Sequence, residues 1–107
     1  MLIAESVSLE LVAALRPLVS RIKRCDRSFA DQLTRSASSV TLNIAEASYS
    51  DPGKRKARFF TAAGSANETR AAVRLAGAWG YCTAAQAEAA RVLTLHPSAL
   101  RPQRAGP

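Results

Sequence analysis

The sequence predicts an all-α fold, an antiparallel up-down-up-down four-helix bundle, on three observations. Of the 107 residues, 22 are alanine, which is the best helix former and is depleted from strands. Four stretches place apolar residues at the three- and four-residue spacing of a helix face. Short connections between these stretches favour antiparallel neighbours around one core. We therefore expect one domain, with the bundle over residues 1–96 and a flexible basic tail over residues 97–107.

The first helix is expected from about Ser6 to Arg24. Its apolar stripe, at spacings of four, three, four and four residues, is Val7, Leu11, Ala14, Leu18 and Ile22. Pro17 lies inside this stretch, where it removes a backbone donor. We therefore expect the helix to bend or to divide into two pieces.

The second helix is expected from Ser28 to about Tyr49. The Ser28 hydroxyl is placed to cap the helix, with Asp31 as its capping-box partner three residues later. The apolar seam alternates spacings of three and four residues. It consists of Ala30, Leu33, Ala37, Val40, Ile44 and Ala47. The turn-forming residues 50–53, Ser-Asp-Pro-Gly, end this helix.

The third helix is the longest and is expected from Pro52 to about Gly80. One stripe along it consists of Phe59, Ala62, Ala66, Thr69, Val73 and Ala76. A second stripe, of the small residues Gly64, Ala71 and Ala78, lets a neighbouring backbone approach closely. Two interpretations follow. Either the first stripe meets the core and the second meets another subunit, or both lie inside a tight alanine-rich core.

The fourth helix is expected from Thr83 to about Leu95. Thr83 and Gln86 have capping-box spacing, and Pro97 ends the helix. From Pro97 onward the chain combines proline, glycine and arginine without periodicity, which is typical of a flexible tail.

The sequence predicts neither a catalytic nor a metal centre. The single histidine, His96, stands next to Pro97 at a helix end, where it complements the helix dipole rather than forming part of a nucleophile–base pattern. Cys25 and Cys82 lack the paired spacing of zinc ligands and are expected to be reduced packing residues. We expect no enzyme activity, no metal and no cofactor.

The chain is expected to be cytoplasmic, with no membrane partner. It has no apolar run near the roughly 20 residues that cross a bilayer. Its N-terminus lacks the basic and apolar regions of a secretion signal.

Net charge points to polyanionic partners, and the alternative is that it only maintains solubility. The 15 Lys and Arg residues exceed the eight Asp and Glu residues by seven, which attracts nucleic acid. Lys54, Arg55, Lys56 and Arg58 begin the third helix, where the positive dipole end disfavours cations. With the free backbone amides there, we expect these four residues to contact phosphates. The alternative is neutralisation by Glu5 and Glu10 from the same end of the bundle.

A second basic group surrounds the end of the first helix, where cations suit the dipole. It consists of Arg16, Arg21, Lys23, Arg24 and Arg27. The aromatic residues are not interleaved with basic residues along the chain, so the pattern does not indicate base stacking.

A buried polar network is expected between the second and third helices. Asn43 and Glu46 lie one turn apart beside the apolar seam, and Asn67 and Glu68 lie in the middle of the third helix. With Arg35, Arg70 or Arg74 as counter-charge, they are placed to fix helix register. The expected members are Arg35, Asn43, Glu46 and Glu68. The alternative is that these side chains are solvated.

Two runs of residues carry a family resemblance. Residues 32–46 match the pattern QLxRxAxSVxxNIAE, and residues 58–68, Arg-Phe-Phe-Thr-Ala-Ala-Gly-Ser-Ala-Asn-Glu, follow in matching order and separation. The chain resembles the four-helix bundle proteins encoded in 23S rRNA intervening sequences, over about half its length, from Asp31 to Tyr81. Ala47 stands where that family usually has glycine, so the exit from the second helix is expected to differ.

The resemblance implies a cytosolic, non-enzymatic bundle that assembles into a homo-oligomeric ring, with five subunits preferred. It also implies a relation to accessory proteins of diversity-generating retroelements, which engage RNA and a reverse transcriptase. The signature positions it implies are Arg35, Asn43, Glu46, Gly64, Ser65 and Glu68. This set suits bundle architecture and assembly better than catalysis.

Two hypotheses of function follow. The leading one is a ring-forming scaffold whose basic surface contacts RNA or DNA backbones. Its expected partners are further copies of the chain, RNA or DNA, and a reverse transcriptase or another protein. The alternative is a protein-binding assembly module without nucleic-acid affinity.

Overall fold

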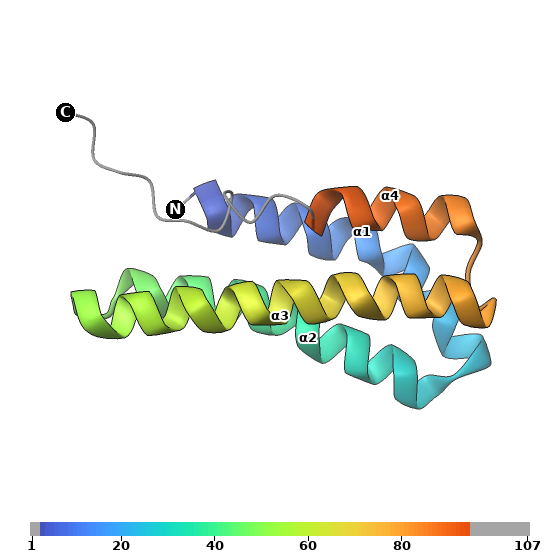
Figure 1. Ribbon diagram of the computed structural model, residues 1–107, viewed down its shortest axis with the longest axis horizontal. Coiled ribbons are helices and arrows are strands. Elements are labelled where there is room, and N and C mark those ends of the chain that lie inside the picture. Colours follow the sequence, from blue (N-terminus) through green and yellow to red (C-terminus); the bar gives the residue numbers. More distant parts are fainter. Residues whose placement is uncertain (1–2, 95–107) are drawn as a thin grey trace.

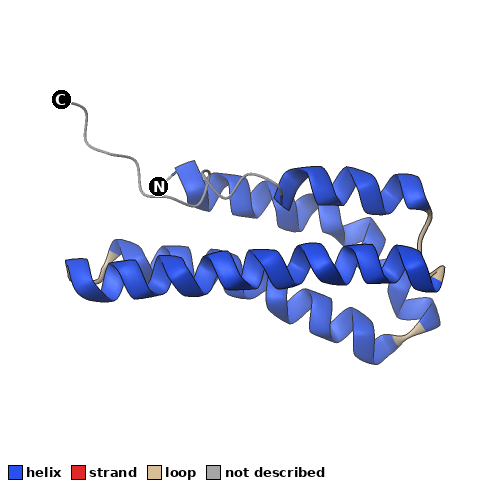
Figure 2. Cartoon of the chain, viewed as in Figure 1, coloured by secondary structure: helices blue, strands red, loops and turns tan. Residues whose placement is uncertain are grey.

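The computed structural model describes residues 3–94, with side chains from residue 4 to residue 90 (Figure 1). Its helices are α1 (Ile3–Cys25), α2 (Arg27–Ser48), α3 (Pro52–Trp79) and α4 (Ala84–Thr94). Each helix packs on the next and α4 also contacts α1, so the predicted all-α up-down bundle is confirmed. Only short loops join the helices within the described residues (Figure 2). His96 and the expected tail at 97–107 lie outside them.

The core divides into two clusters. The larger cluster draws on all four helices and includes Leu11, Leu15, Leu18, Ile22, Leu33, Val73 and Ala87. The smaller cluster lies toward the α2–α3 turn and consists of Ala4, Val40, Ile44, Ala47, Phe59, Ala62 and Ala66. Among the side chains that the structure describes, residues 4–90, it draws on α1, α2 and α3. In the described part of the chain, no helix is long and apolar enough to cross a membrane.

The two stripes of α3 have different environments. Every residue of the first stripe, from Phe59 to Ala76, is buried. The second stripe is not, because Gly64, Ala71 and Ala78 are all exposed on the outer face of α3. The interpretation that both stripes lie inside the core is therefore wrong. The bundle covers α3 from the α2 and α4 sides and leaves its outer face open.

Pro17 does not divide the first helix. The helix is continuous from Ile3 to Cys25, slightly longer than the predicted Ser6–Arg24. Pro17 and Ala13, whose carbonyl the proline cannot bond, are both exposed. The freed carbonyl therefore lies on the exposed side of the helix, within reach of solvent, and the helix continues through the proline.

The N-cap of α2 is Asp26, so the predicted capping pair of Ser28 and Asp31 is wrong. Asp26 has extended backbone angles, φ −156° and ψ 96°, and its side chain accepts a hydrogen bond from the Phe29 amide. The donor–acceptor distance is 3.0 Å. Because α1 ends at Cys25, a single residue separates the two helices, and the carboxylate in that position also suits the positive end of the α2 dipole.

The turn from α3 to α4 follows the sequence signals. Gly80 ends α3 with φ +79°, and the Tyr81 amide donates to the Ala76 carbonyl at 2.9 Å, the pattern of a Schellman motif. Thr83 and Gln86 make both reciprocal capping-box bonds, at 3.0 and 3.1 Å, which confirms the predicted start of the fourth helix. Gly77 lets α4 approach, because a Cβ there would lie 3.1 Å from the Cβ of Ala87.

The two cysteines are both free, with Cys25 exposed and Cys82 buried. Burial raises the pKa of the Cys82 thiol above its ordinary value, while nearby Arg21 lowers it by a smaller amount. We predict that iodoacetamide at pH 8 alkylates Cys25 readily and Cys82 at least about tenfold more slowly, because Cys82 reacts only through transient opening. Mass spectrometry of the native chain and of Cys25→Ser measures the two rates. Equal rates would place Cys82 outside the core.

Candidate nucleic-acid interface

The basic cluster predicted from the sequence lies at one end of the bundle, in a segment that we call the α2–α3 tip (residues 47–58). Asp51 caps α3, accepting a 2.9 Å hydrogen bond from the Lys54 amide, and Pro52 is the first helical residue. This start places Lys54, Arg55, Lys56 and Arg58 in the first two turns of α3, all exposed. The tip projects beyond the described ends of α1 and α4 (Figure 1).

Asp51 changes how an anion can approach this helix start. The sequence suggested free backbone amides as a phosphate site, but the Asp51 side chain already accepts from Lys54, and its carbonyl accepts from the Arg55 amide at 2.8 Å. The carboxylate also occupies the positive end of the dipole. The Lys54 and Arg55 amides are therefore already bonded, and the positive charge that the tip exposes lies on its side chains.

Arg55 is bound to the end of the preceding helix. Its Nε donates to the Ala47 carbonyl at 3.3 Å, and one terminal nitrogen donates to the Ser50 carbonyl at 3.4 Å. The last carbonyls of a helix carry its negative dipole end, which attracts a guanidinium. Arg55 therefore closes the α2–α3 turn from within the chain.

Arg58 also has partners on α2. Its terminal nitrogens lie 3.9 Å from Glu46 Oε1 and 3.5 Å from Asn43 Oδ1. Neutralisation of the cluster from within the chain therefore occurs, but through α2 and not through Glu5 and Glu10 as the alternative interpretation had it. The reason is proximity, because α2 enters the turn directly before α3 and lies alongside it.

Lys54 and Lys56 are the cations that remain available. Among the described side chains, residues 4–90, neither ammonium group has a partner in a hydrogen bond or an ion pair. The two residues are separated by roughly 200° around the helix, so they flank α3 instead of sharing one face. The predicted four-residue cluster is thus two arginines that bind α2 and two lysines that extend into solvent on either side.

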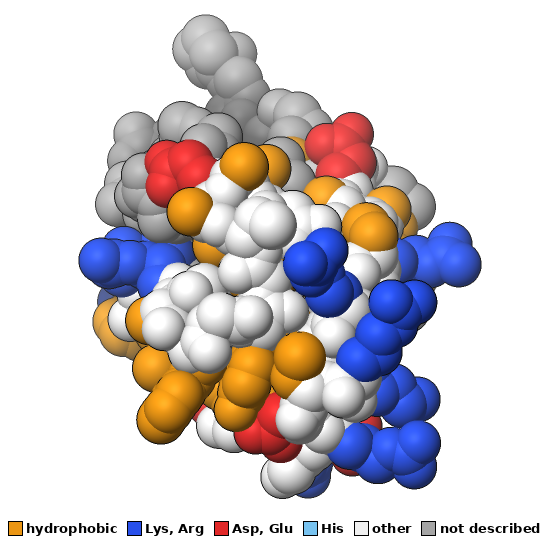
Figure 3. Space-filling view, turned by 90° about the vertical axis from the view of Figure 1, so that its right-hand side faces the viewer, with side chains coloured by type: hydrophobic (Ala, Val, Ile, Leu, Met, Phe, Trp, Pro, Cys, Tyr) orange, Lys and Arg blue, Asp and Glu red, His pale blue; other side chains and the backbone are white. Residues whose placement is uncertain are grey.

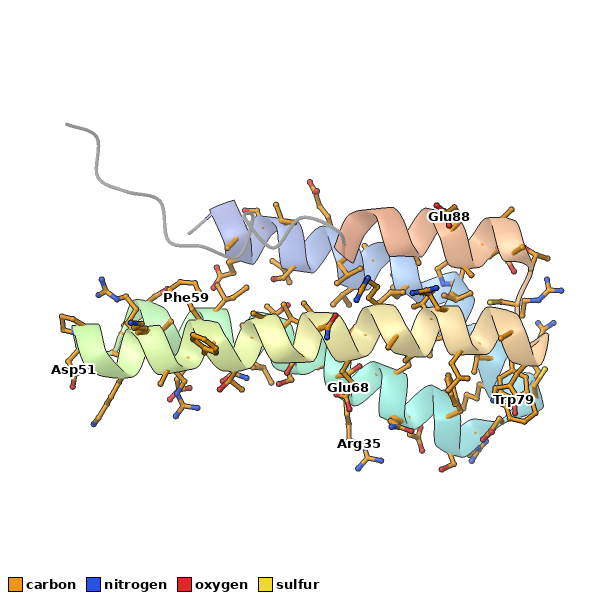
Figure 4. All side chains as sticks on the ribbon, viewed as in Figure 1. Arg35, Asp51, Phe59, Glu68, Trp79 and Glu88 are labelled. Carbon is orange, nitrogen blue, oxygen red and sulfur yellow. The ribbon has the colours of Figure 1, made fainter. Side chains whose placement is uncertain are left out.

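The predicted buried network does not form as expected. Arg35, Glu46 and Glu68 are all exposed, and only Asn43 and Glu46 meet, through Arg58. Arg35 and Glu68 point to the same side of the α2–α3 pair (Figure 4). Asn67 pairs within its own helix, accepting from Arg70 at 2.7 Å. Charged side chains of this length remain in water because the free energy of desolvating them would exceed the attraction gained by pairing them.

Small hydroxyl residues line the interface between α2 and α3 instead. We call this group the hydroxyl seam; Ser36 and Thr69 in it are buried, and Ser39 and Ser65 are partly buried. The Thr69 hydroxyl donates to the Ser65 carbonyl at 2.8 Å and lies 3.0 Å from the Ser36 hydroxyl. The Ser39 and Ser65 hydroxyls are 2.9 Å apart. Asn43 Nδ2 extends the seam toward the tip, donating to the Ser39 carbonyl at 2.8 Å and to its hydroxyl at 3.0 Å.

Sequence reasoning missed this seam, although its signal is present. Ser36 and Ser39 are three residues apart on α2, and Ser65 and Thr69 are four apart on α3, so each pair shares a face beside an apolar stripe. Small polar residues at helical spacing on two adjacent helices were the pattern to find. In the part of the chain with described side chains, no group of three or more His, Cys, Asp or Glu residues is placed to hold a metal ion.

Comparisons with known proteins agree with the fold. The model of one protein family, described as 23S rRNA-intervening sequence protein, matches residues 2–96. A crystal structure of a protein of unknown function from the S23 ribosomal protein family of Bacteroides thetaiotaomicron aligns with a TM-score of 0.83 and 23% sequence identity. The alignment covers 91% of this chain and 93% of that one. No curated protein matches the chain significantly.

The hydroxyl seam makes a testable contribution to stability. We predict that Thr69→Val lowers the free energy of unfolding by about 1–2 kcal/mol, because valine keeps the shape of the fully buried Thr69 but breaks its hydrogen bonds. Urea denaturation followed by circular dichroism measures the loss.

Thr61→Val is the matched control, since Thr61 is exposed and bonds only within its own helix. A change within about 0.5 kcal/mol is expected there. Equal losses in both variants would contradict the seam.

Proposed function

The chain belongs to the 23S rRNA-intervening sequence protein family, and we propose that it is a non-enzymatic, homo-oligomeric scaffold that contacts RNA or DNA backbones through the α2–α3 tip. The observation that carries the proposal is the pair of lysines on that projecting tip. Lys54 and Lys56 present cations with no acidic partner in the described chain, on a protein of net charge +7. Phosphates are the anions that such a surface attracts from solution.

The contact is expected to recognise the backbone and not the bases. Ammonium groups on flexible stems bind phosphates as point charges and carry no sequence information. Because the lysines stand on either side of α3, the tip is suited to a contact in which phosphates pass on both sides of the helix. Arg55 and Arg58 support the tip by holding it to α2.

Assembly is supported by apolar surface that the chain leaves uncovered. Leu42 on α2 is 66% exposed, Tyr49 at the C-cap of α2 is 94% exposed, and Phe60 on α3 is 74% exposed. Large apolar side chains that remain exposed are candidates for contacts with a second copy of the chain. A ring requires two different surfaces that meet head to tail, and α2 and α3 each offer one. We propose a ring of about five copies, the number that the family resemblance implies.

Gly64 adds a second argument for assembly. Nothing lies within 4 Å of a Cβ built at this position, so packing within the chain does not require a glycine. A glycine inside a helix costs about 1 kcal/mol relative to alanine. Close approach of a second copy over the exposed Gly64, Ala71 and Ala78 stripe gives this residue a role.

The phosphate contact is tested by binding across a range of salt concentrations. We predict that Lys54→Ser combined with Lys56→Ser weakens binding of a labelled RNA or DNA duplex and reduces the slope of log affinity against log salt by about two. Fluorescence anisotropy measures both. The control is Arg16→Ser with Arg74→Ser, which removes the same charge from exposed positions outside the tip. Equal effects in the two double variants would indicate a general charge effect. No binding by the native chain would favour the protein-binding module.

The assembly surface is tested by mass in solution. We predict that light scattering gives a particle of about five times the 11.4 kDa chain mass and that Gly64→Glu reduces it, because a charged side chain blocks close approach of a second copy. Ala89→Glu, at an exposed site on α4, is the control and should leave the mass unchanged. A monomeric native chain would remove the ring from the proposal.

A further inference from the structure

A group of aromatic side chains lies at the opposite end of the bundle from the α2–α3 tip. We call it the aromatic platform (Trp79, Tyr81 and Phe29). The Trp79 and Tyr81 rings are stacked, with centroids 6.3 Å apart and planes inclined by 16°. Phe29 meets Tyr81 edge-on, with centroids 5.7 Å apart and planes inclined by 73°. Both geometries are favourable for aromatic pairs.

The platform is held in place by the ends of three helices. The Tyr81 hydroxyl donates to Asp26 Oδ2 at 3.1 Å, while Oδ1 of the same carboxylate caps α2 at the Phe29 amide. The left-handed Gly80 turns the chain back after α3, so that Tyr81 lies beside Trp79. Partial burial and the Asp26 hydrogen bond raise the pKa of the Tyr81 phenol above its ordinary value, which agrees with its role as the donor to Asp26. The indole therefore rests on a fixed support.

Trp79 nevertheless remains 66% exposed. One side of the indole rests on Tyr81, and the rest of the ring faces solvent at the end of the bundle, where Figure 4 labels it. An indole fixed by a stacked neighbour loses little conformational entropy on binding a further ring. The arrangement is that of a stacking surface, and the core clusters do not include Trp79.

Cations lie at the same end of the bundle as the platform. Arg21, Lys23, Arg24 and Arg27 are exposed around the end of α1 and the start of α2. Figure 3 views the molecule onto this end, with Lys and Arg side chains along one edge and hydrophobic surface beside them. Two acidic residues lie in the same stretch, namely Asp26, which is engaged by Tyr81 and the cap, and the exposed Asp31. The local balance is therefore positive.

We propose that the aromatic platform stacks a base of a single-stranded nucleic acid while the surrounding cations hold the adjoining phosphates. Every nucleobase has a flat face, and base–aromatic stacking beside a basic groove is the chemistry of single-strand binding. A duplex keeps its bases stacked on each other and offers the indole no free face within the helix. The positive local balance of this surface favours a polyanion as its occupant.

The inference rests on the proposed function, since it takes nucleic acid as the ligand, but it concerns a different site. About 42 Å of α3, from 28 residues at 1.5 Å each, separates its two ends. The tip contributes contacts to backbone at one end, and the platform selects unpaired bases at the other. The sequence pattern showed no interleaving of aromatic and basic residues. The fold places both kinds of residue at one end of the bundle, although they are distant along the chain.

The chain itself supplies the probe, because Trp79 is its only tryptophan. We expect titration with a single-stranded oligonucleotide to quench the Trp79 fluorescence. An abasic strand of the same length has the same phosphates but no bases, and a matched duplex has no free bases. Both are expected to bind through charge and to leave the Trp79 fluorescence unchanged.

Two substitutions give a second measurement. Trp79→Leu is expected to weaken single-strand binding between about fivefold and a hundredfold, the equivalent of 1–3 kcal/mol for one stacked base. Its salt slope should remain unchanged, since no cation is lost. Trp79→Phe keeps an aromatic face and is expected to retain most of the affinity. Thermal unfolding and light scattering of both variants show whether fold and assembly are intact.

The outcomes separate the two proposals. If no nucleic acid binds the native chain, both fail. Salt-dependent binding with unquenched Trp79 and no loss in Trp79→Leu overturns the stacking site alone and leaves the tip in place. If the abasic strand quenches Trp79 as strongly as the strand with bases, the stacking site is likewise overturned and the tip remains in place. A lower particle mass in Trp79→Leu would assign the indole to a contact between copies and would also overturn the stacking site.

Discussion

The close packing of α2 against α3 is the constraint on which the rest of the structure depends. These two helices form the largest interface in the bundle, and small side chains line it. Buried hydroxyls must find partners, because an unsatisfied one costs 1–3 kcal/mol. Ser36 and Thr69 each bond a carbonyl of their own helix, and their hydroxyls also meet across the interface at 3.0 Å. These contacts across the hydroxyl seam form in one axial alignment of α3 relative to α2, which an alanine-rich surface alone would leave loosely specified.

That register determines what happens at each end of α3. At the tip it brings Arg55 over the last carbonyls of α2 and Arg58 beside Glu46. At the other end it brings Tyr81 to Asp26, at the start of α2, and so sets Trp79 on its support. A shift of one helical turn would move these contacts by about 5.4 Å and break both sets together. Tip and platform are thus coupled through a single interface.

Periodicity was enough to predict the helices, their order and the buried stripe of α3, because burial follows the repeat of the helix. It could not predict partners across helices. The Ser28 cap failed because the choice of cap depends on where the preceding helix ends, and Cys25 leaves Asp26 as the only residue between the two helices. The network of Arg35 and Glu68 failed because shared spacing does not show whether a long charged side chain leaves water. Phe29 and Tyr81 are distant in sequence, so their contact depends on topology.

The basic start of α3 illustrates how a locally unfavourable feature becomes favourable in the hairpin. Cations at a helix N-terminus oppose the dipole of their own helix. In an antiparallel pair, however, the N-terminus of α3 lies beside the C-terminus of α2, whose dipole end is negative. Arg55 bonds to that end and Arg58 to a carboxylate near it, while the Asp51 carboxylate caps α3 itself. Three side chains around the α2–α3 connection, those of Asp51, Arg55 and Arg58, therefore offset the unfavourable dipole interaction. Lys54 and Lys56 have no part in that resolution. Their charge is surplus to these contacts, and the proposed phosphate contact rests on that surplus.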